Sequence, residues 1–381
     1  MGKRELLLIL AFAVAGVAAY QLAAPSRPEG SSRVSIGSAI EHLRRAVRGN
    51  PGRAETAATQ SHLLAPSVTD LSLRLGGATL TLTGEARDDL AVDLRVWSTG
   101  YDDAEAQSLA KQTQFTVDPA GSTAIGSINY PRGGSQRATI TLKVPSRLRL
   151  RIERSGPTTI DNVSAVELIG ARSRSSISRV PGAAAGSFRG GELTLTDVGT
   201  AKLSAQSSDV KIAGVRDLTM TVRGGELRAE RISGTVELEC SESEVTLDKL
   251  GDLSAPLRVN ASGGTVTVNG LRGEARIDGR NTEFDIVIDR AAPIAIYSEG
   301  DETIRLTPPP GGYRLDALVR DGRLTPPDLL AELGFELAKV EGSEEVRATG
   351  AVGGGGPTIT VRARQGDLVL RPRGGEKGEK K

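Results

Sequence analysis

A four-residue pattern of polar, apolar, polar and apolar residues returns six times between residues 192 and 286. Its first apolar residues lie 17, 17, 18, 21 and 18 positions apart: Leu193, Val210, Leu227, Val245, Val266 and Phe284. Ile160 and Ile177 extend the series upstream by steps of 17 and 16. Alternation is typical of a strand with one buried face, and a constant spacing is typical of stacked repeats. The sequence therefore predicts an all-β fold, a parallel β-helix or β-solenoid with about 17–18 residues per rung.

The composition agrees with a narrow core made of thin layers. Aromatic residues make up only 3% of the chain, so Val, Leu, Ile and Ala must supply most buried contacts. Because a solenoid grows in one dimension, we expect one body from 381 residues instead of two or three domains. The single cysteine, Cys240, occupies an apolar position of the alternation and is predicted to be a core residue.

The N-terminus has the features of an export segment. Lys3 and Arg4 precede an apolar run that begins at Leu6 and reaches Ala24 with a short interruption. As a helix this run would be about 28 Å long, close to the ~30 Å hydrocarbon core of a membrane. Small residues at 17–19 also suit a signal-peptidase site. An uncleaved anchor and a cleaved signal both remain open, and both place the rest of the chain outside the cytoplasm, in the bacterial cell envelope facing the periplasm or the cell exterior.

The remaining chain divides by composition and pattern. A hairpin is expected from residues 71–75 and 78–84, a helix from 102–112, and a strand from 138–144. Pro326, Pro327 and Asp328 predict a short capping helix that reaches Leu333. The expected segments are 1–24, an anchor or signal; 25–61, a flexible linker with a possible short helix; 62–157, an N-terminal β-rich part; 158–306, the regular repeats; 307–370, irregular rungs and a cap; and 371–381, a disordered tail.

The sequence offers little material for catalysis. His42 and His62 are the two histidines, and both precede the repeats, which disfavours a Ser-His-Asp triad or a His-based zinc site. The run 353–356 is all glycine, but no Gly-Lys-Ser/Thr follows, so a turn is favoured over a phosphate-binding loop. Nearly equal numbers of basic and acidic residues, 48 and 47, disfavour nucleic-acid binding. We expect no cofactor and no catalytic residue.

Acidic residues open most copies of the pattern. In a parallel stack their positions would lie about 4.8 Å apart, and like charges there repel. Solvent and the nearby Arg189, Arg223 and Arg280 are expected to relieve that repulsion. The alternative is that these carboxylates bind Ca²⁺. The residues of this acidic ladder are Glu192, Asp209, Glu226, Glu244 and Glu283.

Several short motifs resemble a known family. The strand 139–144 followed by Pro145, and units such as 208–212, 263–268 and 365–370, are similar to the bacterial putative-adhesin family of β-strand-repeat domains, a family of unknown function. The Gly-rich turn and strand at 353–361 match its closing segment. The resemblance covers residues 71 to 370 and implies a non-enzymatic envelope protein. Copies such as Ser243-Glu244 lack the turn glycine of the family unit.

Two functions follow from these features. The first is a non-catalytic, adhesin-like binding or scaffold module of the cell envelope, attached to the membrane by its N-terminus, with an envelope protein or a surface polysaccharide as partner. The alternative is a carbohydrate-active β-helix enzyme resembling a polysaccharide lyase, which would need aromatic residues and clustered acids in a groove. A filament-forming β-helix is a third interpretation, disfavoured by the export segment.

Overall fold

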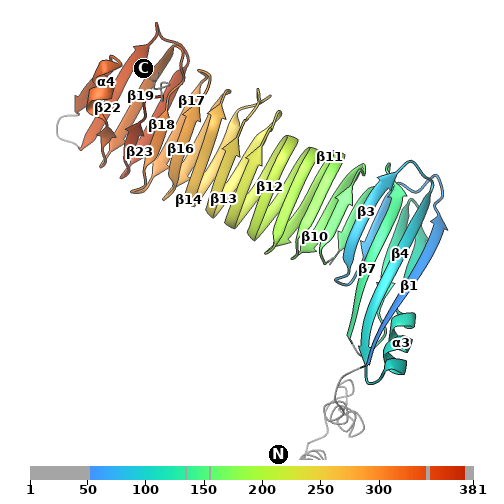
Figure 1. Cartoon of the computed structure of the whole chain (residues 1–381). Helices are drawn as coiled ribbons and strands as arrows, with labels where there is room; N and C mark the ends of the chain where they lie inside the picture. Colours follow the sequence, from blue (N-terminus) through green and yellow to red (C-terminus); the bar gives the residue numbers. More distant parts are fainter. Residues whose placement is uncertain (1–51, 134, 154–155, 340–343, 374–381) are drawn as a thin grey trace, which may run out of the picture. The chain divides into compact units, whose positions relative to one another are not determined.

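The computed structural model describes residues 52–133, 135–153, 156–339 and 344–373. These residues are almost entirely β, in one 24-stranded sheet with two short helices, α3 and α4 (Figure 1). The strands are β1 (Gly52–Leu63), β2 (Asp70–Arg74), β3 (Thr79–Glu85), β4 (Asp89–Gly100), β5 (Gln114–Ala120), β6 (Thr123–Asn129), β7 (Ser135–Pro145), β8 (Arg149–Glu153), β9 (Thr158–Asp161), β10 (Ala165–Ala171), β11 (Ser175–Arg189), β12 (Glu192–Glu230), β13 (Val236–Asp248), β14 (Leu257–Leu271), β15 (Ala275–Arg280), β16 (Glu283–Ile288), β17 (Ile294–Glu299), β18 (Ile304–Thr307), β19 (Tyr313–Arg320), β20 (Leu324–Thr325), β21 (Glu336–Lys339), β22 (Glu345–Val352), β23 (Thr358–Arg364) and β24 (Leu368–Leu370).

The expected anchor or signal at 1–24 and the short helix of the linker lie outside the described residues. No helix within the described ranges is long and apolar enough to span a bilayer. The expected linker at 25–61 is wrong at its end, because residues from Gly52 onward form β1. Polar side chains contribute to this strand, since the Thr59 hydroxyl donates to Asp93 on β4 at 2.8 Å. The composition of this segment is typical of a flexible linker because β1 buries little apolar surface.

The chain forms two compact units instead of the expected single body, and the smaller one is organised by a helix. Its described residues are 52–56, 96–113, 130–133 and 135–137. Helix α3 (Asp103–Gln112) begins as the sequence predicts, with the Asp102 carboxylate accepting from the Glu105 amide at 2.8 Å. Ala106 and Ala110 are buried, and the Ser98 hydroxyl donates to the Ala106 carbonyl.

The larger unit is a ladder of parallel strands that follows the sequence repeat. Leu227 pairs with Val245, Val245 with Val266, and Val266 with Phe284. Strands β10 to β18 follow one another along the ladder in Figure 1. The first apolar residues of all six copies are at most 1% exposed, so the predicted inward face is confirmed. Burying an apolar side chain contributes roughly 1.5–3 kcal/mol, so each strand turns its apolar face inward and its polar face to solvent.

The chain turns at two rows of residues with left-handed backbone conformation, each recurring once per period. The first row is Asn162, Arg179, Asp197, Gly214, Arg231, Lys249 and Gly270. The second row is Gly190, Ser207, Gly224, Glu242, Gly263 and Asn281. These turns explain how β12 can hold 39 residues of continuous pairing. The corners are as periodic as the strands, although glycine is absent from many of them.

Two kinds of corner alternate in the second row. At one kind a second glycine follows, as at Gly225 and Gly264, where a side chain would overlap backbone atoms of the preceding rung. At the other kind a buried hydroxyl follows and donates to the carbonyl two residues earlier. The hydroxyl-to-carbonyl distances are 2.9, 2.7 and 2.9 Å for Ser208, Ser243 and Thr282. Copies without the turn glycine therefore close their corners with a side-chain hydrogen bond.

The structure corrects two expectations about pairing. Ile177 pairs with Leu195, and Ser175 takes the place opposite Leu193, so the upstream isoleucines belong to the second apolar row. The hairpin expected at 71–84 is also wrong. Strand β2 pairs in parallel with β6 and β8, and β3 with β7 and β9, which uses the hydrogen-bonding edges that a hairpin would need. The antiparallel hairpin in this part is β5–β6.

The C-terminal rungs are irregular, as the sequence predicts. Strand β17 pairs with β23 and β18 pairs with β24, so residues 358–370 lie against residues 294–307 although β19 and β20 come between them in sequence. Strand β19 pairs with the other edge of β23 in parallel, and with β22 antiparallel. Helix α4 (Pro327–Glu332) lies where predicted, with Leu330 fully buried.

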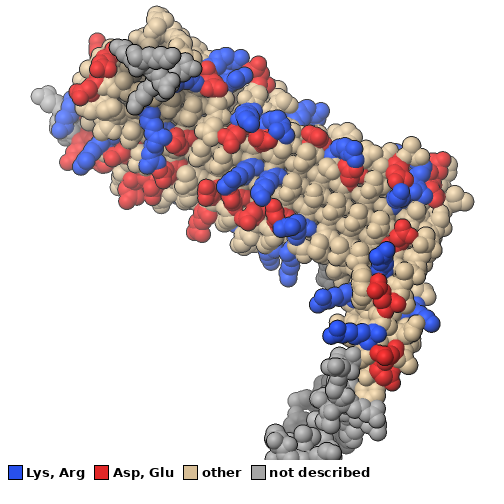
Figure 2. Space-filling model, viewed as in Figure 1, with Lys and Arg blue, Asp and Glu red and all other residues tan. Residues whose placement is uncertain are grey.

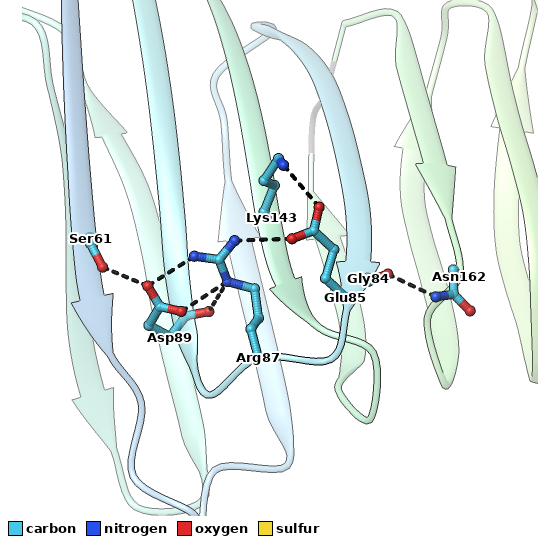
Figure 3. Close-up of polar contacts among 7 residues, drawn as sticks. All are labelled: Ser61, Gly84, Glu85, Arg87, Asp89, Lys143 and Asn162. Atoms are coloured by element: carbon cyan, nitrogen blue, oxygen red, sulfur yellow. Dashed lines mark hydrogen bonds and ion pairs between the residues drawn. The ribbon is translucent and has the colours of Figure 1, made fainter.

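Arg87 fastens the first strands of the larger unit together (Figure 3). Its guanidinium donates to Asp89 at 2.9 Å and to Glu85 at 3.2 Å. Ser61 on β1 donates to Asp89 at 2.7 Å, and Lys143 on β7 lies 2.9 Å from Glu85. Hydrogen bonds from Arg87 and then Ser61 lower the pKa of Asp89 from 3.8 to about 2.

Candidate binding groove

The acidic ladder lies on one face, but its members are paired with cations other than those expected. Glu192 lies 2.9 Å from Lys211 and 3.1 Å from Arg174, and Lys211 is the larger cause of its lowered pKa. Glu226 pairs with Arg228, and Glu283 pairs with Arg305. Within the described ranges, Asp209 and Glu244 have no ion pair. Charges of both signs are interspersed over the surface in Figure 2.

The expectation that Arg189, Arg223 and Arg280 relieve this ladder is wrong. Each precedes a corner, so the turn separates it from the acid that follows in sequence. Thr265 also interrupts the ladder between Glu244 and Glu283. Within the part of the chain that the structure describes, no group of three or more His, Cys, Asp or Glu side chains is placed to hold a metal ion. The Ca²⁺ hypothesis therefore has no cluster to support it.

A groove crosses the ladder elsewhere, at the strand ends that precede the second row of corners. Two hollows of about 450 and 410 Å³ share Asp278, Gly279 and Glu299 and adjoin to form it. One wall is a row of register partners: Thr221, Glu239, Asn260, Asp278, Tyr297 and Arg362. The other wall is the row Arg223, Ser241, Ser262, Arg280, Glu299 and Arg364. The rows lie two residues apart on every strand, about 7 Å, so the groove runs across the strands.

Small residues between the two walls form the floor of this groove. Cys240, Ala261, Gly279, Ser298 and Ala363 occupy successive rungs there. A side chain at Gly279 would overlap the ring of Phe284, which fills the interior behind it. Burial raises the pKa of the Cys240 thiol to about 12, in agreement with its expected place as a core residue. Because successive residues of a strand point to opposite faces, the side chains of this row, which begins at Val222 on β12, point into the ladder, and their backbone forms the floor.

One floor residue has an unsatisfied polar atom. Ser298 is 6% exposed, and its hydroxyl oxygen is buried with no hydrogen-bond partner within the described ranges. The hydroxyls of Ser208, Ser243 and Thr282, in contrast, each donate to the carbonyl two residues earlier. Leaving a buried hydroxyl unpaired costs about 1–3 kcal/mol, and the Ser298 hydroxyl lies on the interior side of β17.

Several charged side chains along the walls form only long ion pairs or none. Arg280 and Arg364 flank Glu299 from the two adjoining strands, at 3.6 and 3.8 Å, longer than a charge-assisted hydrogen bond. Arg223 has no ion pair within the described ranges. Arg362, in contrast, is held by Asp316 at 2.5 Å.

Tyr297 is the exposed aromatic residue of the groove. Its side chain is 39% exposed, and the guanidinium of Arg276 lies 5.3 Å from the ring centroid. Arg276 also holds Asp278 at 2.9 Å. The wall that carries Tyr297 thus combines an aromatic ring with the amide of Asn260 and the carboxylate of Glu239.

A third hollow of about 450 Å³ differs in its charges. It lies over β2, β8 and β10, where Arg149 contacts Asp70 at 2.9 Å and Arg151 contacts Glu167 at 3.0 Å. Its charged side chains therefore satisfy one another. The groove between Arg223 and Arg364 is the better candidate for a binding site because its polar groups retain unused donors and acceptors.

Sequence reasoning found few of these residues. The sequence pattern indicates Arg223 and Arg280 only as counterions of the acidic ladder. Their shared position just before a corner is the feature that could have placed them in one row. Arg364 could not be found, because residues 300–357 separate it in sequence from its neighbour Glu299. His62 lies 3.2 Å from Gln60, far along the ladder from the groove, and His42 lies outside the described residues.

Comparisons with known proteins add little. No protein-family model matches the chain, and no curated protein matches it. Among solved structures, the chain is similar to a putative cell adhesion protein from Clostridium sporogenes, at 13% identity over 84% of this chain and 100% of that one, with a TM-score of 0.19. A TM-score this low carries no argument about fold or function, so the family resemblance stays an expectation.

Proposed function

We propose that this chain is a non-catalytic, adhesin-like binding module of the bacterial cell envelope that holds an extended polymer in the groove. The observation that supports it is the groove itself, whose walls carry unused Arg, amide and aromatic groups on six successive strands. A groove that crosses many rungs suits a ligand with a linear repeat better than a compact small molecule.

We further infer that the ladder is a β-solenoid. The parallel registers advance by one sequence repeat per rung, and two rows of corners turn the chain once each per period. The close approach of Phe284 on β16 to Gly279 on β15 supports two inward faces packed against each other. This architecture would keep the two walls of the groove parallel and rigid.

Export to the envelope, with residues 1–24 as anchor or signal, is part of the same proposal. Its support is the charged start and the apolar run of the sequence. Fractionation of cells that express the full chain, followed by protease treatment of intact cells, tests it. Protection of the whole chain in the cytoplasm would contradict it.

The binding function is tested with the full-length chain in mild detergent, used as bait in envelope extract. Retained proteins are identified by mass spectrometry and retained glycans by sugar analysis. We expect a surface polymer to be retained and to be lost when Tyr297→Ala and Asn260→Ala are combined. Equal retention by the variant and the parent would contradict the groove as binding site.

The lyase-like alternative retains one supporting observation, because Glu239, Asp278 and Glu299 lie in the same groove as Tyr297. Incubating the retained polymer with the chain and measuring its length separates the two functions. Shortening that disappears in Glu239→Gln would favour the enzyme, and an unchanged length supports the binding module.

A further inference from the structure

We propose that the groove binds an acidic linear polysaccharide, one whose sugars carry carboxylates, with the Arg280–Arg364 wall facing the carboxylates. This inference rests on the proposed function and names the ligand class of that site. Two observations carry it: the spare guanidinium donors of one wall, and the amide, carboxylate and aromatic ring that the other wall presents.

The first observation is the charge of the wall from Arg223 to Arg364. Three guanidiniums share this row with a single carboxylate, Glu299. Glu299 lies 3.6 Å from Arg280 and 3.8 Å from Arg364, so it forms no short bidentate pair with either. A guanidinium has five N–H donors in a planar fork that matches a carboxylate. This wall therefore holds spare donors suited to planar anions.

The spacing of these guanidiniums suits a repeating ligand. Arg280 and Arg364 lie on β15 and β23, with β17 between them, which places their backbones about 9.6 Å apart along the groove. In a linear polysaccharide with a two-fold screw, every second sugar presents its carboxylate to the same side. Two successive carboxylates on the same side of such a chain would each contact one guanidinium.

The second observation is the chemistry of the opposite wall. Two of its three charged members, Asp278 and Arg362, are already held by Arg276 and Asp316, at 2.9 and 2.5 Å. Asn260, Glu239 and Tyr297 remain to contact a ligand. An amide and a carboxylate accept or donate to sugar hydroxyls, and an exposed ring offers an apolar face with a polar tip. The two walls thus match the two sides of an acidic sugar chain.

The test uses the full-length chain in mild detergent and three soluble probes: polygalacturonate, alginate, and polygalacturonate with its carboxyls methyl-esterified. The esterified probe keeps the sugar backbone and removes the charge. Binding is measured by calorimetry at several NaCl concentrations. We expect binding to at least one acidic probe, weakening as salt rises, and at least tenfold weaker binding to the ester. Equal binding of the ester overturns the acidic class, and binding of no probe overturns it as well.

Variants locate the ligand in the groove. Arg280→Gln and Arg364→Gln should each weaken binding to the acidic probe about tenfold, which corresponds to about 1.4 kcal/mol. Arg258→Gln is the matched control, since Arg258 lies on the same face two residues from Asn260 and outside the groove. Identical affinities for the Arg280, Arg364 and Arg258 variants would overturn the assignment.

Different results would contradict the proposed function and this inference. Retention of a neutral polymer from envelope extract, with no affinity for acidic probes, leaves the binding module standing and removes the acidic class. Retention of nothing from extract, with no affinity for any probe, removes both.

Discussion

The ring of Phe284 on β16 occupies the space behind Gly279 on β15 that a side chain at position 279 would need. Phe284 is the largest fully buried side chain of the described residues, and it takes the apolar position that Val and Leu hold in the other copies. A large residue on one strand is therefore matched by the smallest residue on the strand it faces.

This match predicts a coupling between the two positions. Gly279→Ala should destabilise the chain by about 1–3 kcal/mol through overpacking, and Phe284→Leu should also destabilise it by leaving a cavity. The double variant should lose less stability than the sum, because leucine leaves room for the new methyl group. Chemical denaturation of the four proteins measures the coupling. Strict additivity would show that the two residues do not share this space.

The alternation of the strands predicts opposite outcomes at neighbouring positions. Val245 is fully buried and Thr246 is on the outer face. Val245→Asp should cost more than about 3 kcal/mol, because it buries an unpaired charge. Thr246→Asp should change stability by less than about 0.5 kcal/mol, with Arg228 beside it on the next strand. Similar melting temperatures for the two variants would refute the register.

The corners predict a difference between two glycines of nearly identical backbone conformation. Gly264 has φ +83° and Gly354 has φ +84°. A methyl group at Gly264 would overlap the Ser243 backbone, and at Gly354 nothing lies within 4 Å. Both Ala variants place a Cβ in the left-handed region, which costs about 1–2 kcal/mol, and Gly264→Ala should cost at least about 2 kcal/mol more. Equal losses, measured by thermal denaturation, would show that the corner can shift at no cost.

The Arg87 network predicts an acid-sensitive contribution to stability. The pKa of Asp89 is about 2 in the folded chain against 3.8 for the free group. Between these values the unfolded chain binds more protons, so stability rises with pH there. The contribution is complete above a pH of about 3.8 and disappears as the pH falls toward 2. Melting temperatures from pH 2 to 6 measure it.

The control for this prediction is Asp89→Asn, which removes the titrating group. Arg87→Gln removes the principal cause of the lowered pKa. Both variants should melt at temperatures that depend less on pH over this range than those of the parent. A parent and an Asn variant with the same pH profile would exclude Asp89 as a source of acid sensitivity.

The sequence alone determined where the strands of the regular repeats lie, which side chains they bury, and where α3 and α4 begin. These features are local: alternation, the Asp102 cap and the Pro326–Pro327 pair all act within a few residues. Tertiary structure decided which strands pair. Ile177 pairs with Leu195, and β2 and β3 pair with distant strands instead of each other. The alternating pattern shows which face of a strand is buried, but it does not show which strand lies beside it. The groove depends on the same step, since Glu299 and Arg364 become neighbours only because β23 pairs with β17, a strand far from it in sequence.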